Sequence, residues 1–348
     1  FMEKGEMNML IQGTKKILDQ LNIKPAGLTA PQEELFSWHA NLVTMKRRKT
    51  VLLMNDATRY IVVLWGMKQN EFQNIDYWLT EGLRQTMLAE QIKPELVERY
   101  LNEAGAIKFE KTKNRSQTAK LNQVKETLFY FEDELSTNSV IQTGIAIKSS
   151  KRPVGSGPGN YISPNEWFYT ELRKWYGQEL FKCPMVELEI RLQLEGEPVV
   201  RQITVPLSRT FQELHKILQA SFEWSDSHLH EFRFAAQAES PEVRLVMDEE
   251  AFEYSYGEEK LILEHEVRLV DYLTENLSFQ YVYDFGDDWE HVILVKRIWD
   301  EKDFNHAVCT RVKGNLVTEV KIRISLLESS AAAAGEFISL ITAVCFVF

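Results

Sequence analysis

A segment rich in proline and glycine divides the chain into two halves. The residues from Ser149 to Pro164, SSKRPVGSGPGNYISP, include three prolines and three glycines. Both residue types weaken helices and strand ladders, so this composition is typical of a linker. The chain has 348 residues, which is the length of two ordinary domains. We therefore predict one domain in residues 1–148, a linker at 149–164 and a second domain in residues 165–328.

The order of the predicted elements favours the α+β fold class. In the first domain, runs of β-branched and aromatic residues predict strands, and most segments with a helical spacing of apolar residues follow them. The predicted strands are 36–42, 49–55 and 59–67, and the predicted helices are 14–21, 72–90, 94–104 and 121–135. Strands followed by helices indicate α+β rather than alternating α/β.

The second domain opens with MVELEIRLQL, in which apolar and charged residues alternate as in a half-buried strand. A helix with one apolar face is predicted at 210–222, and a short helix near 269–273. The predicted strands are 185–194, 199–205, 228–235, 260–263, 278–285 and 289–299. This order predicts a small mixed sheet, β-grasp-like in topology, packed on one main helix.

Charge is distributed unevenly between the two halves. Residues 1–160 contain 22 Lys and Arg against 18 Asp and Glu, whereas residues 161–348 contain 18 against 33. An acidic surface repels phosphate, so a nucleic-acid contact would have to come from the first half. Two basic runs there are weak candidates for it, and solvated loops are the alternative. The candidate residues are Lys46, Arg47, Arg48, Lys49, Lys111, Lys113 and Arg115.

The cysteines and the chain ends bear on the cellular compartment. Cys183, Cys309 and Cys345 are far apart, so we expect no disulfide framework and a reducing, cytoplasmic environment. No stretch has the length and hydropathy of a membrane span, so we expect no membrane association. We expect residues 329–348, which combine an alanine run with an apolar stretch, to be a vector-derived tail.

A cluster of polar residues in the second domain is the main candidate for chemistry. Its members are His228, His230, Asp284, Asp287, Asp288, Glu290 and His291. Two histidines with carboxylates suit zinc, manganese or iron, and the candidate ligands are His228, His230, Asp284 and His291. The same groups could serve acid–base catalysis or a binding site. The alternative is structural, because aspartates after Gly286 are favoured by turn chemistry alone.

Residues 185–300 resemble a known bacterial family. The resemblance rests on ELEIRL at 187–192, on FQELHKILQASFEWSDSHLHEF at 211–232 and on YDFGDDWEHVI at 283–293. The family was first named for an open reading frame on an Agrobacterium Ri plasmid, and is also labelled a TnpR-type passenger protein of an insertion element. Residues 9–148, with GTKKILDQL and FSWHANL, resemble an uncharacterised bacterial domain family that implies no activity.

These features favour a non-enzymatic accessory protein associated with mobile genetic elements. In this interpretation the acidic domain binds a protein partner and no cofactor is required. A metal-dependent hydrolase using the histidine and aspartate cluster is one alternative, with a divalent metal as its cofactor. Nucleic-acid binding through the basic first domain is the other alternative.

Overall fold

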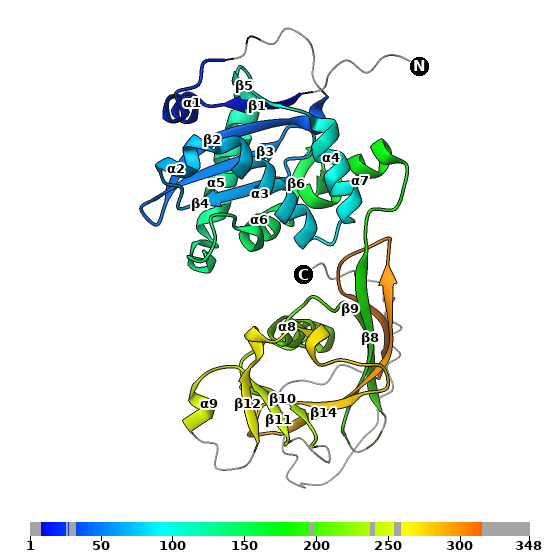
Figure 1. The fold of residues 1–348 in the computed structure, drawn as a ribbon. Helices are drawn as coiled ribbons and strands as arrows, with labels where there is room; N and C mark the ends of the chain where they lie inside the picture. The colour runs from blue at the N-terminus through cyan, green and yellow to red at the C-terminus, as the bar shows by residue number, and fades with distance from the viewer. Residues whose placement is uncertain are drawn as a thin grey trace. The chain divides into compact units, whose positions relative to one another are not determined.

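The computed structural model describes residues 8–25, 27, 33–194, 196, 198–236, 241–253 and 259–314. They form two compact units, the first ending at Lys182 and the second beginning at Cys183 (Figure 1). Each unit combines helices with a β-sheet of its own, so the predicted α+β class is confirmed. The predicted tail at 329–348 lies outside the described residues.

Unit 1 is built on a five-stranded sheet with the order β4-β3-β2-β1-β5. The strands β2, β3 and β4 form the antiparallel meander that the sequence predicts, and β1 runs parallel to both β2 and β5. The sequence patterns did not identify β1 and β5. The strands are β1 (Met9–Gly13), β2 (Ser37–Met45), β3 (Arg48–Asn55), β4 (Ile61–Trp65) and β5 (Ile107–Lys111).

Helices cover both faces of this sheet. Successive residues of β4 point to opposite faces, so Val62 and Leu64 meet α3, where Gly82 allows the close approach. On the other face Ile61, Val63 and Trp65 share a core with α5 and α6. The helices are α1 (Lys15–Leu21), α2 (Gln69–Gln73), α3 (Ile75–Ala89), α4 (Pro94–Ala104), α5 (Arg115–Phe129), α6 (Thr143–Ser150) and α7 (Pro164–Tyr176).

The domain boundary differs from the predicted linker. The segment 149–164 lies within unit 1, where α6 ends and a hairpin of β6 (Val154–Gly157) and β7 (Asn160–Ile162) leads into α7. Helix α7 belongs to the core of unit 1, because the Phe168 ring stacks on Tyr60 with centroids 4.5 Å apart. Local composition cannot reveal such a contact, and the boundary therefore falls after Lys182.

A buried carboxylate also holds α7 in unit 1. Glu90, at the end of α3, is 4% exposed and accepts hydrogen bonds from the hydroxyls of Tyr60 and Tyr169. Burial raises the pKa of Glu90, and the hydrogen bonds from Tyr169 and Tyr60 oppose the rise. The network links the residue before β4, the C-cap of α3 and α7 through their side chains.

Unit 2 contains an eight-stranded sheet with the order β12-β11-β10-β13-β14-β8-β9-β15. The pair β11 and β12 is parallel and every other pair is antiparallel, so the sheet is mixed as predicted but larger than expected. The strands are β8 (Cys183–Leu192), β9 (Val199–Pro206), β10 (His230–Phe234), β11 (Val243–Val246), β12 (Lys260–Leu263), β13 (Ser278–Tyr283), β14 (Trp289–Glu301) and β15 (Val308–Lys313).

One main helix, α8 (Phe211–Phe222), packs on this sheet (Figure 1). Thr210 caps it, because its hydroxyl accepts from the Glu213 amide while the Glu213 carboxylate accepts from the Thr210 amide. The apolar stripe of α8 joins strand residues in a continuous core, which includes Phe211, Leu214 and Phe222. The short helix α9 (Glu250–Glu253) follows β11.

Candidate functional site

Helix α8 and strand β10 bring two buried histidines into direct contact. The rings of His215 and His230 are stacked, and the two side chains are about 3% exposed. His215 occupies a core-facing position of α8, one residue after Leu214 and four before Gln219. A histidine within an apolar helical stripe was the one sequence signal that could have identified this residue.

The polar atoms of His215 are all paired. Its Nδ1 lies 2.8 Å from the Tyr281 hydroxyl and its Nε2 lies 2.7 Å from the Asp226 carboxylate. A neutral ring with its proton on Nε2 satisfies both contacts, since Tyr281 can then donate to Nδ1. Burial is the main cause that lowers the pKa of His215, and the neighbouring His230 lowers it further. The hydrogen bond with Asp226 raises the pKa and opposes both effects. His215 is thus a satisfied neutral group.

His230 has one unpaired nitrogen. Its Nε2 lies 2.9 Å from a carboxylate oxygen of Glu264, which is itself 1% exposed. Its Nδ1 is buried and has no hydrogen-bond partner among the described residues. A buried polar atom without a partner is costly, and such atoms are found where a ligand or water completes the site.

His230 also lines a pocket of about 280 Å³ at the β10–β11–β12 end of the sheet. The apolar part of the lining includes Leu229 and Phe285, whose exposed fractions are 53% and 45%. The charged part of the lining is mostly acidic. The Nε of Arg244 donates a 3.0 Å hydrogen bond to the Glu231 carboxylate, so these two charges offset each other and Asp248 and Glu250 remain. The lining residues are Leu229, His230, Glu231, Arg244, Val246, Met247, Asp248, Glu250, Ala251, Leu261 and Phe285.

The structure brings together only part of the predicted polar cluster. His228 precedes β10 instead of lying on it, so it does not share a strand face with His230. It is exposed, and its Nδ1 lies 3.5 Å from Asp284. Glu290 and Asp288 are exposed on the surface.

Turn chemistry accounts for the position of Asp284. Its backbone is in the left-handed region at φ 59°, and its Oδ1 accepts a 3.0 Å hydrogen bond from the Gly286 amide. The Asp287 amide bonds to the Asp284 carbonyl at 3.1 Å, and Asp288 is left-handed at φ 49°. These aspartates shape the β13–β14 turn, as the structural alternative expects.

His291 lies in the core, apart from the other predicted ligands. It is 0% exposed, and its Nδ1 lies 3.0 Å from the Trp289 carbonyl and 3.2 Å from the Tyr281 carbonyl. Burial lowers its pKa to about 4, against the raising effect of these two hydrogen bonds. His291 is therefore a neutral packing residue at physiological pH.

Three potential metal ligands lie together, and they are not the predicted set. Among the described residues, ligand atoms of His215, Asp226 and His230 lie within 4.8 Å of one another. Stacked rings direct their nitrogen lone pairs into parallel planes, so both rings cannot point at one ion unless one of them rotates. The predicted ligands His228, Asp284 and His291 do not take part in this group, because the turn and the core hold them elsewhere.

The basic residues of the first domain lie at two places in unit 1. Lys46 and Arg47 form the turn between β2 and β3, with left-handed φ values of 42° and 61°. Lys46 pairs with Asp133 at 2.8 Å, and Lys49 donates to Gln20 at 2.7 Å. The second run, Lys111, Lys113 and Arg115, is exposed where β5 leads into α5.

Fold and site together define a chain of two α+β domains, each closed around its own sheet. Residues 10–167 match a domain of unknown function (DUF6933), and residues 184–320 match the plasmid pRiA4b ORF-3-like protein family. These matches confirm the family resemblance of the second domain and the uncharacterised family of the first. No helix of the described residues is long and apolar enough to cross a membrane.

Two other proteins are similar to part of this chain. The uncharacterized protein y4hQ of Sinorhizobium fredii is 34% identical over 118 residues, which is 32% of this chain. The chain spans about half the length of this curated relative, 54%. A crystal structure of MM3350, a protein of unknown function from Methanosarcina mazei Go1, is 28% identical with a TM-score of 0.35. That match covers 40% of this chain and 74% of the other.

Proposed function

We propose that the chain is an accessory protein whose acidic C-terminal unit binds a protein segment carrying an apolar anchor and basic flanks. The observation that carries this proposal is the pocket lined by His230. It combines exposed apolar side chains at Leu229 and Phe285 with an acidic border at Asp248 and Glu250.

Charge complementarity selects the partner chemistry. The stretch 242–253 contains five acidic residues, Glu242, Asp248, Glu249, Glu250 and Glu253, against the single base Arg244. Arg244 is already paired with Glu231 and lies 3.6 Å from Glu259. A cationic segment would gain attraction from this border, while an acidic one would be repelled.

The apolar side chains supply the anchor contact. Apolar pocket residues that become fully covered contribute most of the affinity at small interfaces, and the charged rim mainly sets specificity and association rate. The plasmid origin in the name of the matched family supports the further proposal of a cytoplasmic role associated with mobile elements.

The test uses two fluorescent peptides with the same leucine-and-phenylalanine anchor, one flanked by lysines and one by glutamates. We expect the lysine peptide to bind, as measured by fluorescence anisotropy, and the glutamate peptide to bind more weakly. Phe285→Ala removes an anchor contact and should weaken binding by roughly tenfold, which corresponds to about 1.4 kcal/mol. The double variant Asp248→Lys and Glu250→Lys should reverse the charge preference.

Val312→Ala is the matched control, because Val312 is 49% exposed on β15 and does not line the pocket. It should bind the lysine peptide as the parent protein does. Equal affinity for both peptides, or an equal loss in Phe285→Ala and Val312→Ala, would show that the pocket is not the binding site.

A metal-dependent hydrolase is the second candidate, and the grouping of His215, Asp226 and His230 favours it. Two imidazoles and a carboxylate are a suitable ligand set for zinc or manganese. The ring stacking and the complete hydrogen bonding of His215 oppose it. Elemental analysis for zinc, manganese and iron tests this second candidate.

A further inference from the structure

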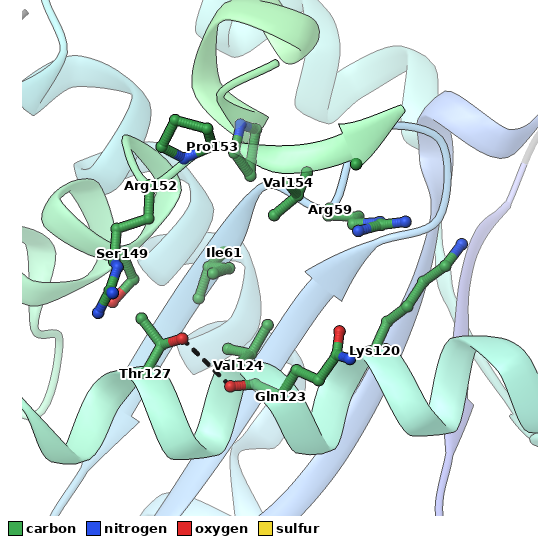
Figure 2. Close-up of a pocket in the computed structure, with 12 residues that line it drawn as sticks. Arg59, Ile61, Lys120, Gln123, Val124, Thr127, Ser149, Arg152, Pro153 and Val154 are labelled. Atoms are coloured by element: carbon green, nitrogen blue, oxygen red, sulfur yellow. Dashed lines mark hydrogen bonds between the residues drawn. The ribbon is translucent and has the colours of Figure 1, made fainter. Parts of the chain in front are cut away.

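A second pocket, in unit 1, has a different character from the acidic one. It measures about 330 Å³ and lies between α5, the turn before β4 and the segment that follows α6 (Figure 2). None of its lining residues carries a carboxylate, and three carry a positive charge. The lining residues are Arg59, Ile61, Lys120, Gln123, Val124, Thr127, Ser149, Arg152, Pro153, Val154, Gly155 and Pro164.

Two of the cations at this pocket lack a side-chain partner. Among the described residues, no carboxylate or other acceptor forms a hydrogen bond or ion pair with the Arg59 guanidinium or the Lys120 ammonium. Burial lowers the pKa of Lys120, and the positive charge of Arg59 lowers it further, while Asp56 and Glu34 oppose the change. Positive charge that is partly desolvated and unpaired attracts an anion from solution.

The backbone of Arg59 supports a role for its side chain. Arg59 follows the Asn55–Thr58 turn and has φ at 63°, a left-handed conformation that glycine adopts freely and that costs other residues about 1 kcal/mol. The Arg59 amide bonds to the Asn55 carbonyl at 2.9 Å, which keeps the turn closed. Arg59 thus occupies a position where the backbone conformation favours glycine.

The opposite end of the pocket is polar as well. Figure 2 shows Ser149 and Arg152 at one end, Arg59 and Lys120 at the other, and Ile61 and Val124 between them. Ser149 is 3% exposed, and its hydroxyl is buried without a partner among the described residues. The Arg152 guanidinium lies over the Tyr130 ring, 5.3 Å from its centroid, which holds the cation in place.

We propose that this pocket binds a small organic anion. Its phosphate or carboxylate group lies between Arg59 and Lys120, and its apolar body lies on Ile61, Val124 and Val154. A polar group at its far end reaches the Ser149 hydroxyl and Arg152. The volume falls at the lower end of the range for small-molecule sites, which suits one compact ligand better than a polymer. This site is separate from the partner pocket of the C-terminal unit.

The experiment measures binding to the full chain by isothermal titration calorimetry. The probes are inorganic phosphate, adenosine monophosphate as a phosphate ester and phenylacetate as a carboxylate. We expect one of the two organic anions to bind more tightly than inorganic phosphate, because inorganic phosphate lacks the apolar body. Preference for the ester or for the carboxylate then identifies the anionic group. Binding by none of the three probes, or by inorganic phosphate alone, overturns the proposal.

Substitutions place the binding in the pocket. Arg59→Met and Lys120→Met should each weaken binding of the organic anion by about tenfold or more, since each removes a charge-assisted contact. Lys120→Met should also raise the melting temperature of the free protein, because it removes an unpaired, partly buried charge. A purely structural role for Lys120 predicts the opposite change in melting temperature.

Lys125→Met is the matched control on the same helix, because Lys125 lies over Phe129 and does not line the pocket. It should leave the affinity unchanged. An equal loss in Lys125→Met, together with binding of a short oligonucleotide, would indicate a diffuse basic surface and overturn the proposal. If Arg59→Met does not fold, Arg59→Gly serves in its place, because glycine suits the left-handed backbone.

Discussion

The imidazole rings of His215 and His230 lie parallel, with their centroids 3.4 Å apart and their planes inclined by 2°. This contact joins α8 to β10 inside the acidic unit. The His215 ring is paired at both nitrogens, to the Tyr281 hydroxyl and to the Asp226 carboxylate. The stack is therefore a packing contact that fixes the helix on the sheet.

Elemental analysis tests whether this pair holds a metal. We expect purified protein to contain no stoichiometric zinc, manganese or iron by plasma mass spectrometry, since the stacked rings cannot both direct a lone pair at one ion. Near-stoichiometric metal in the parent protein, lost in His215→Ala and in His230→Ala, would contradict this expectation. It would also establish the ligand set of the hydrolase hypothesis.

His291 should make the stability of the C-terminal unit depend on pH. Its folded pKa is about 4 because it is buried, whereas an unfolded histidine titrates near 6.5. The unfolded chain therefore binds more protons in this window, and the free energy of unfolding falls as pH decreases from about 6.5 toward 4. The pKa difference corresponds to a loss of about 3 kcal/mol in the free energy of unfolding when the pH has fallen to about 4.

The variant His291→Phe keeps a ring in the core and removes the titrating group. Urea unfolding at several pH values should show a weaker pH dependence for His291→Phe than for the parent protein between about pH 4 and 6.5. His215, whose pKa burial also lowers, contributes with the same sign in both proteins. Identical pH dependence in the two proteins would mean that His291 is not the buried neutral group described above.

The position of α7 predicts which fragments fold. A fragment of residues 8–182 should unfold cooperatively, while residues 8–148 should not, because the shorter one lacks the Phe168 ring and the Tyr169 hydroxyl. Within the full chain, Phe168→Ala should destabilise unit 1 by about 3–5 kcal/mol. Thermal unfolding followed by circular dichroism measures the cooperativity of the two fragments and the stability of Phe168→Ala. Cooperative unfolding of the 8–148 fragment would restore the boundary at the proline-rich segment.

Gly82 tests the close approach of α3 to β4. A methyl group there would lie 3.0 Å from Leu64 Cδ2 and 3.0 Å from Val62 Cγ1. Gly82→Ala should therefore destabilise the protein by about 1–3 kcal/mol, despite the higher helix propensity of alanine. The control is Gly144→Ala in α6, where nothing lies within 4 Å of the added methyl and a small gain in stability is expected. Chemical denaturation compares the two variants.

The sequence predicted the elements whose signals are local. Alternation of apolar and charged residues identified β8, and the apolar stripe identified α8. By contrast, β1 and β5 are each five residues long and are stabilised by pairing with parallel neighbours. No local sequence pattern encodes that pairing. The boundary was misplaced for the same reason, because the contact of Phe168 with Tyr60 spans more than a hundred residues.

The candidate site was predicted only in part. His230 was identified, but its partner Glu264 and its stacking neighbour His215 come from distant segments and have no fixed spacing to it. The aspartates at 284, 287 and 288 drew attention as possible ligands, although the turn explains Asp284 by its hydrogen bond to the Gly286 amide. The pocket cations Arg59 and Lys120 meet only through the fold.

The place of β1 between β2 and β5 has a consequence for synthesis on the ribosome. The chain makes β1 first, yet its second neighbour is complete only when Lys111 has been added. Until then, one side of β1 presents unpaired amide and carbonyl groups to other nascent chains or chaperones. Of the five strands of this sheet, β1 is therefore the first to be made and waits for the last, β5, to be fully paired, and translation speed through β5 should influence how much chain reaches the native state.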